Sequence, residues 1–298
     1  MTLPIASGPG GRGAVPFLRR FARPFDLAGL DSALARSGAL EARLAATKKE
    51  VRRAQKLRYR VFFEEGGATP DPTARLIRRD VCRFDRVADH LVVVDWNELH
   101  RDGAPRVVGV YRLLRQDVAE RNFGFCSAGE FDVEALTARR PDLRFLEVGR
   151  ACIASSHRGK HVLELLWRGL WAYARHHGMD VMIGCASLPG ADPAAHAGAI
   201  RALAEGGGDP AWRVAPRPDR LEAAPEREPA PADPRTLVRV LPPLVKGYWR
   251  LGATFSPISV VDRSFDTTDV FVVLPLHDVE ERYLQHFGVE AMARRLAA

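Results

Sequence analysis

The sequence predicts an α/β fold built from mixed layers of helices and strands, and three observations indicate this. One segment, 159–178, repeats apolar residues at helical spacing and ends at Gly178, which is typical of a packed helix. There is no G-x-G-x-x-G motif and no P-loop, so a doubly wound nucleotide-binding sheet is disfavoured. Short apolar runs predict strands at 90–96, 106–114, 145–153, 179–187, 258–262 and 269–276.

The remaining segments set the expected domain organisation. A helix is predicted over about 40–64, and the two glycines at 66–67 fit its C-terminus. The segment 206–235 contains seven prolines and many charges, which favours an exposed surface insert outside the core. We therefore expect a basic, partly mobile segment over 1–40, followed by one domain over 41–298.

The composition is that of an ordinary globular protein. Of the 298 residues, 46% are hydrophobic and 27% are charged. The four cysteines are far apart and form no C-x-x-C pair, so a disulfide scaffold and a zinc ribbon are disfavoured and no metal is expected. The N-terminus lacks a secretory signal, and no stretch approaches the about 20 apolar residues of a membrane span. These features predict a cytoplasmic protein, with peripheral contact at the inner membrane face left open.

Positive charge is concentrated near the N-terminus. Residues 1–60 hold thirteen Lys and Arg against four Asp and Glu, a balance of +9, whereas the whole chain carries +7. The charge is densest over 47–60, where an acidic protein, anionic lipid headgroups or nucleic acid could bind. A solvated helix face is the alternative without any partner. Nucleic acid ranks last, because no recognised nucleic-acid module accompanies the block.

The predicted strand 145–153 carries two charged residues among apolar ones. Glu147 and Arg150 would be desolvated in a buried strand and therefore need compensation. Their odd spacing directs them to opposite faces of a regular strand, but a β-bulge at Gly149 would bring both to one face. We expect them to line a polar cleft together, with a structural ion pair as the alternative.

A short polar loop joins this strand to the helix 159–178. A loop that leads into a helix N-terminus presents free backbone N–H groups and the positive end of the helix dipole. Arg158 and Lys160 add positive charge to it. The loop therefore predicts an anion site, suited to the phosphate of a carrier cofactor.

Three blocks of the sequence are distinctive: IGCASLPG at 183–190, LPPLVKGYWRLGA at 241–253 and FDTTDVFVVLP at 265–275. Together with the strand 145–153 and the R-G-K loop before the helix, they resemble the GNAT acyltransferase superfamily. More closely, they are similar to the ornithine N-acyltransferases that make lyso-ornithine lipid, a haemolysin-like subfamily. The resemblance extends over about 57–288.

This resemblance implies a GNAT-like fold, in which a central mixed sheet contains a bulged, splayed strand pair and has flanking helices. It implies an acyltransferase that moves a 3-hydroxyacyl chain from acyl-carrier protein to the α-amine of L-ornithine, the first step of ornithine lipid synthesis. The co-substrate is then a phosphopantetheine thioester, with no bound cofactor. The later glycines of the general GNAT loop are missing after Arg158, which favours acyl-carrier protein over coenzyme A.

The resemblance also implies roles for individual residues, and it extends more loosely to acyl-homoserine-lactone synthases. Glu147 is expected to act as the base or to position water, with His157 as an alternative base. The other expected site residues are Arg58 or Arg150 for the acceptor carboxylate, Asp85 and Asp89 for its ammonium, and Arg158, Gly159 and Lys160 for the phosphopantetheine phosphate.

Two other functions stay open on sequence alone. One is acylation of another amino acid, or synthesis of an acyl-homoserine-lactone signal. The other is lipid binding without catalysis, in a haemolysin-like protein. The expected partners are acyl-carrier protein and L-ornithine, with anionic membrane as a further candidate and no nucleic acid.

Overall fold

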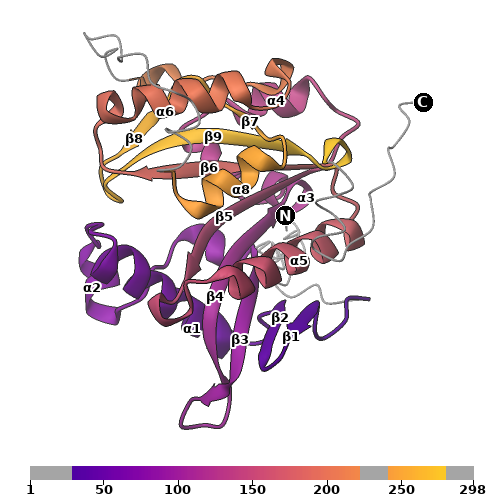
Figure 1. The fold of residues 1–298 in the computed structure, drawn as a ribbon, viewed down its shortest axis with the longest axis vertical. Helices are drawn as coiled ribbons and strands as arrows, with labels where there is room; N and C mark the ends of the chain where they lie inside the picture. Colours follow the sequence, from indigo (N-terminus) through magenta and orange to yellow (C-terminus); the bar gives the residue numbers. More distant parts are fainter. Residues whose placement is uncertain (1–28, 222–240, 280–298) are drawn as a thin grey trace, which may run out of the picture.

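The computed structural model describes residues 29–221 and 241–279, and Figure 1 shows them as one large sheet with helices packed around it. Within these residues the strand order is β1-β2-β3-β4-β5-β6-β9-β7, and β8 pairs with β9. β5 and β6 are parallel, whereas the other neighbours are antiparallel. The α/β fold class is confirmed. The strands are β1 (Ala35–Ser37), β2 (Leu40–Leu44), β3 (Asp89–Leu99), β4 (Pro105–Arg115), β5 (Phe145–Ile153), β6 (Val181–Pro189), β7 (Thr254–Phe255), β8 (Val260–Asp262) and β9 (Thr267–Pro275).

All six predicted strands and the long predicted helix are present. The helix 159–178 is α5, and Gly178 follows it with φ +58°. None of the described helices is long and apolar enough to cross a bilayer. The described α-helices are α1 (Lys48–Tyr59), α2 (Pro72–Ile77), α3 (Gln116–Glu120), α4 (Val133–Ala138), α5 (Lys160–His176), α6 (Pro193–Gly206) and α8 (Pro243–Arg250).

The helix predicted over 40–64 is wrong in its first part. Leu40–Leu44 forms β2, which pairs with β3 and leaves no exposed edge there. Thr47 then begins α1, because its hydroxyl accepts a hydrogen bond from the Glu50 backbone N–H. After Tyr59 the helix widens into the π-helical turn η1 (Arg60–Glu65).

Apolar side chains fill both faces of the sheet. Along β9, Val270 and Val272 belong to a cluster that includes the buried face of α5. Phe271 and Val273 belong to a second cluster, with Phe131. Since successive strand residues point to opposite faces, the two clusters lie on opposite sides of the sheet.

The segment 206–235 is predicted to be an exposed surface insert, but part of its described portion is buried. Trp212 and Val214 are buried in the second apolar cluster, so this part belongs to the core. The expectation failed because it weighed the prolines and charges and overlooked two large apolar side chains. Residues 222–240 lie outside the described residues, as do 1–28 of the predicted mobile segment 1–40. Ala35–Ser37 within that segment is strand β1.

A β-bulge and a strand separation shape the centre of the sheet. Val110 pairs with Cys152 and Arg112 with Gly149, so Tyr111 alone faces both Arg150 and Ala151. The bulge is confirmed, but its positive φ of +53° belongs to Arg150 and not to the glycine. On the other side of β5, pairing with β6 ends at Glu147 and Ile183. The two strands diverge from there.

Candidate functional site

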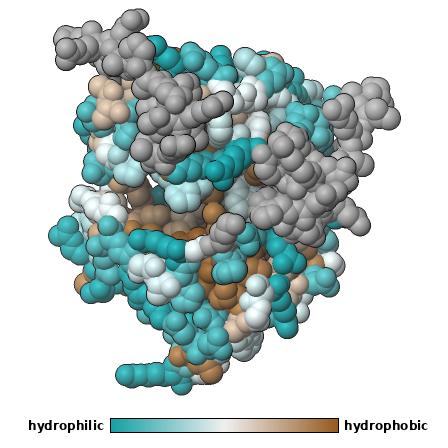
Figure 2. All heavy atoms as spheres, viewed as in Figure 1, coloured by the Kyte–Doolittle hydropathy of each residue, from teal (hydrophilic) through white to brown (hydrophobic). Residues whose placement is uncertain are grey.

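A cavity of about 670 Å³ opens where β5 and β6 separate. In the space-filling view of Figure 2, apolar atoms lie in a recess between the two halves of the molecule. The walls come from η1, β5, β6, α8 and the start of β9, which are distant in sequence. The apolar lining includes Phe62, Val148, Leu244, Val245 and Phe265, and the charged lining includes Glu65, Arg150, Arg158, Asp262, Asp266 and Asp269.

Arg150 lies in the wall of this cavity, as the sequence predicts. Its guanidinium carbon lies 4.3 Å from the centre of the Phe265 ring, a cation–π geometry. Its Nε lies 3.5 Å from Asp80 Oδ2 and makes no hydrogen bond within the described part of the chain. A non-glycine residue in the left-handed region costs about 1–3 kcal/mol. The bulge therefore holds this side chain at the cavity against a conformational cost.

Two tyrosines that the sequence analysis missed also line the cavity. The hydroxyl oxygens of Tyr111 and Tyr248 are 3.2 Å apart, and both side chains are buried. Burial raises the pKa of Tyr248 to about 12 and that of Tyr111 well above its ordinary value. Both groups therefore remain protonated. One proton is shared within the pair, which leaves the other for a ligand.

Glu147 does not share the position of Arg150. One of its oxygens accepts a hydrogen bond from the Cys126 N–H at 2.7 Å, and the other accepts from the Ser127 N–H at 2.7 Å and the Ser127 hydroxyl at 2.5 Å. The carboxylate is buried and is not among the described residues that line the cavity. The expected placement of Glu147 in the cleft is wrong, because the 126–127 turn satisfies its charge instead.

Arg58, Asp85 and Asp89 are also away from the cavity. Arg58 is fully buried and binds both oxygens of Asp85, with Asp80 as a second carboxylate partner. Asp89 accepts a hydrogen bond from the Tyr173 hydroxyl at 2.6 Å. These charges are paired inside the protein and lie outside the described cavity lining, so their expected contact with substrate stays a prediction. The sequence pattern of arginine and acids is accounted for by this buried network.

The other predicted site residues lie in or beside the loop before α5, and they differ in whether they line the cavity. His157 lies 3.2 Å from Asp95 through Nε2 and 2.8 Å from the Ser156 hydroxyl through Nδ1, outside the described cavity lining. Arg158 lines the cavity and pairs with Glu65 of η1. Gly159 is the N-cap of α5, and Lys160 is the first residue of that helix.

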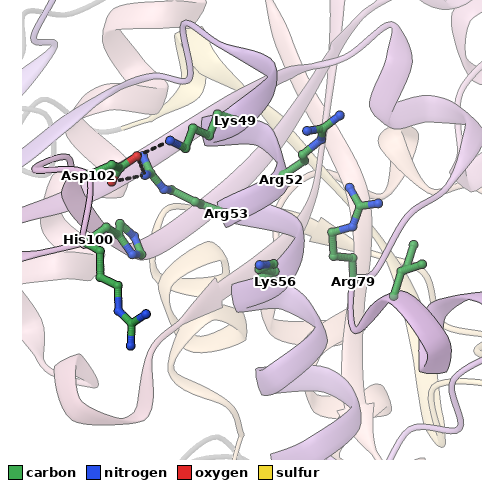
Figure 3. A pocket seen from close by; sticks show the side chains of 9 residues that line it. Lys49, Arg52, Arg53, Lys56, Arg79, His100 and Asp102 are labelled. Carbon is green, nitrogen blue, oxygen red and sulfur yellow. Dashed lines mark hydrogen bonds and ion pairs between the residues drawn. The ribbon is translucent and has the colours of Figure 1, made fainter.

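A second depression, about 770 Å³ in volume, lies on the basic face of α1. Figure 3 shows Lys49, Arg52, Arg53 and Lys56 projecting from this helix, with Arg79 beside them. Asp102 binds Lys49 and Arg53. For Arg52 and Lys56, no ion pair with a described residue is present. A net positive surface therefore remains over the region where the sequence is most basic; His100 and Arg101 complete its rim.

Comparison with known proteins identifies relatives over most of the chain. A family model described as an acetyltransferase (GNAT) domain matches residues 57–168. The L-ornithine N(alpha)-acyltransferase of Brucella abortus (strain 2308) is 44% identical over 259 residues, which cover 87% of this chain and 92% of the relative. The L-ornithine N(alpha)-acyltransferase of Agrobacterium fabrum is 45% identical over 264 residues, 86% of this chain and 87% of the relative.

Among solved structures, FeeM, an N-acyl amino acid synthase from uncultured soil microbes, aligns with a TM-score of 0.44 and 11% identity over 79% of this chain and 90% of that chain. The GNAT match spans η1, β4 and β5, which contribute side chains to one wall of the cavity. The curated relatives cover more than four fifths of the chain, so the likeness extends well beyond the GNAT match. The protein is an acyltransferase, and the chain belongs to the family of L-ornithine N(alpha)-acyltransferases.

Proposed function

We propose that this enzyme transfers a 3-hydroxyacyl chain from acyl-carrier protein to the α-amine of L-ornithine, with the cavity between β5 and β6 as the reaction site. The observation that carries the proposal is the composition of this one cavity. It combines an apolar wall for an acyl chain, arginines for anionic groups and carboxylates for an amine. A protein that only binds lipid would need only the apolar wall.

The carbonyl of the thioester sits at the separation of the strands. Backbone groups of β5 beyond Glu147 have no partner strand on the β6 side, so N–H groups there are available to the carbonyl oxygen. Such donors stabilise the oxyanion that forms when the amine attacks. Arg158 lines the same cavity and directly precedes Gly159, the N-cap of α5, so this end of the helix and the arginine attract the phosphate of the phosphopantetheine arm.

The acceptor is oriented by its charged groups. Arg150 binds the α-carboxylate, since its side chain lines the cavity and its position in the bulge fixes it there. The neutral α-amine then attacks the thioester carbon, a C–N bond forms and the C–S bond breaks. The amine loses one proton to the Tyr111–Tyr248 pair as the pair passes one proton to the leaving thiolate, so both hydroxyls end the step protonated.

Acyl-carrier protein docks on the basic face of α1. Arg52 and Lys56 stand on the outer side of the helix whose C-terminal turn, η1, forms part of the cavity wall. A carrier protein held there would reach the cavity through its flexible arm. The interaction is between opposite charges and is expected to weaken as the salt concentration rises.

Purified enzyme supplied with 3-hydroxyacyl-carrier protein and L-ornithine tests this proposal. We expect an Nα-acylated product, identified by fragmentation mass spectrometry, and a lower kcat/KM with acyl-coenzyme A. The Arg150→Gln variant should lose activity by about 10- to 100-fold through ornithine KM, whereas Arg201→Gln on the exposed face of α6 serves as the matched control. A product formed on Nδ, or on S-adenosylmethionine in place of ornithine, contradicts the proposal.

A further inference from the structure

Three carboxylates converge where β8 and β9 meet the cavity. Glu130, Asp262 and Asp269 each place one oxygen within 4.8 Å of the others. Asp262 and Asp269 come from the neighbouring strands β8 and β9, and both line the cavity. Arg220 pairs with this cluster, with its Nη2 3.7 Å from Glu130 Oε1, and Arg150 also acts on Asp269 through its charge. The cluster thus carries more negative than positive charge.

One member of the cluster has an unused acceptor in a buried position. Asp269 is 6% exposed, and its Oδ1 accepts no hydrogen bond from the described residues. A buried carboxylate oxygen without a donor costs free energy, so an atom of this kind in a cavity wall indicates that a ligand supplies the donor. This observation is independent of the clustering itself.

The electrostatics of the three groups favour the binding of a cation. Burial, together with the charges of Asp269 and Asp262, raises the pKa of Glu130 to about 7. Burial likewise raises the pKa of Asp269 above its ordinary value. Without a cation the cluster therefore retains a proton near neutral pH, and a bound cation would release it.

We infer that Glu130, Asp262 and Asp269 bind the side-chain ammonium of the acceptor, and that they select a diamino acid over a simple one. This inference rests on the proposed function, and it identifies the part of the cavity that recognises the side chain of the acceptor. Arg150 and Asp269 line the same cavity with opposite charge, so the acceptor spans them from its carboxylate to its terminal ammonium.

An ammonium fits the cluster better than a divalent metal ion. One oxygen of Asp262 already accepts hydrogen bonds from the Ser264 backbone N–H, the Ser264 hydroxyl and the Phe265 N–H. Calcium and magnesium usually take six or more oxygen ligands. An ammonium needs three acceptors, which is the number that the cluster offers.

Acceptor competition tests this inference. L-norvaline has the carbon skeleton of L-ornithine without the terminal amine, so the ratio of their kcat/KM values isolates the ammonium contact. We expect Asp269→Asn to lower kcat/KM for ornithine by about 10- to 100-fold and to change that for norvaline by less than about twofold. Asp132→Asn is the control, because Asp132 caps α4 two residues from Glu130 and asparagine can cap as well.

Three outcomes overturn the inference. Equal loss with both acceptors shows that Asp269 acts on the α-amine or on the fold, and equal use of both acceptors by the wild type shows that no ammonium site exists. Stoichiometric Mn²⁺ binding that disappears in Asp269→Asn shows a metal site instead. Glu130→Gln gives a second test of the same ratio where Asp269→Asn fails to fold.

Calorimetric binding of the two amino acids separates this inference from the proposed function. If the wild type acylates neither acceptor, the proposed function fails. Ornithine binding that is stronger than norvaline binding, and that weakens in Asp269→Asn, still supports the ammonium site. Equal binding of the two amino acids by the wild type overturns it.

Discussion

The guanidinium of Arg58 lies 2.9 Å and 2.7 Å from the two carboxylate oxygens of Asp85, and no part of the arginine is exposed. This pair ties α1 to the turn that precedes β3. Burial alone would raise the pKa of Asp85, but the charge and hydrogen bonds of Arg58 outweigh it and hold that pKa below its usual range. The contact is therefore a structural one.

Removing one member of this pair should destabilise the protein. Asp85→Asn leaves the buried Arg58 charge with less compensation, and we expect the free energy of unfolding to fall by about 3 kcal/mol. Urea denaturation at pH 7 measures it. Asp117→Asn breaks a pair with Arg121 that is exposed and should change the free energy by less than about 0.5 kcal/mol. Equal effects of the two variants contradict the prediction.

The same pair predicts a pH dependence. The pKa of Asp85 is lower in the folded than in the unfolded chain, so its contribution to stability is complete above about pH 4 and is lost as the pH falls. Below that pH, the free energy of unfolding of the wild type should fall more steeply with decreasing pH than that of Asp85→Asn. Parallel curves for the two proteins would show that Asp85 is not responsible.

The tyrosine pair should affect turnover more than substrate binding. Tyr248→Phe removes the hydroxyl that pairs with Tyr111, and we expect kcat to fall by about 10- to 100-fold with little change in either KM. The double variant with Tyr111→Phe should be no slower than the slower single variant, because the two hydroxyls act as one unit. Additive losses, or an unchanged kcat, contradict a shared role.

The basic face of α1 should discriminate between donors. Arg52→Glu with Lys56→Glu should raise KM for acyl-carrier protein by about tenfold or more at low salt, and should leave acyl-pantetheine unaffected. Arg201→Glu, a single charge reversal on the exposed face of α6, is the control for each of the two replacements made singly. Loss of vesicle binding without any change in KM for acyl-carrier protein would assign this face to anionic lipid instead.

Glu130 should give ornithine a pH profile that norvaline lacks. Its pKa of about 7 reflects burial and the neighbouring acids Asp269 and Asp262, opposed by Arg220 and by the Cys185 thiol at 3.5 Å. As the pH rises through 7 the carboxyl ionises, and KM for ornithine should decrease relative to that for norvaline. In Glu130→Gln this difference should disappear. A difference that persists in this variant would place the titrating group elsewhere.

The fold could be predicted where local patterns are strong. The six strands and α5 follow from apolar runs and helical spacing. The bulge was expected beside Gly149, but it brings only Arg150, and not Glu147, to the cavity. The helix over 40–64 was wrong at its start, because the pairing of β2 with β3 outweighs helix propensity there. Thr47, an N-cap residue, was the available signal.

The candidate site was less accessible from the sequence. Its charged residues were sought where arginines and acids cluster in the chain, but Arg58 and Asp85 compensate each other in the interior. Asp269, Tyr111 and Tyr248 meet only because β9 folds back beside β6 and α8 covers the separation of β5 and β6. The spacing of residues along the chain does not predict contacts between segments that are so distant in sequence.

The π-helical turn at Arg60–Glu65 makes the cavity sensitive to chain length. Such a turn holds about one residue more than the α-helix it interrupts, and here it places Phe62 and Glu65 in the cavity wall. Deleting a single residue from this turn would restore α-helical spacing and rotate the following side chains by about 100°. An insertion of one residue in the loop between β3 and β4, by contrast, lies outside the wall of this cavity. Tolerance to insertions and deletions should therefore differ sharply between these two segments, even where every substitution in them is accepted.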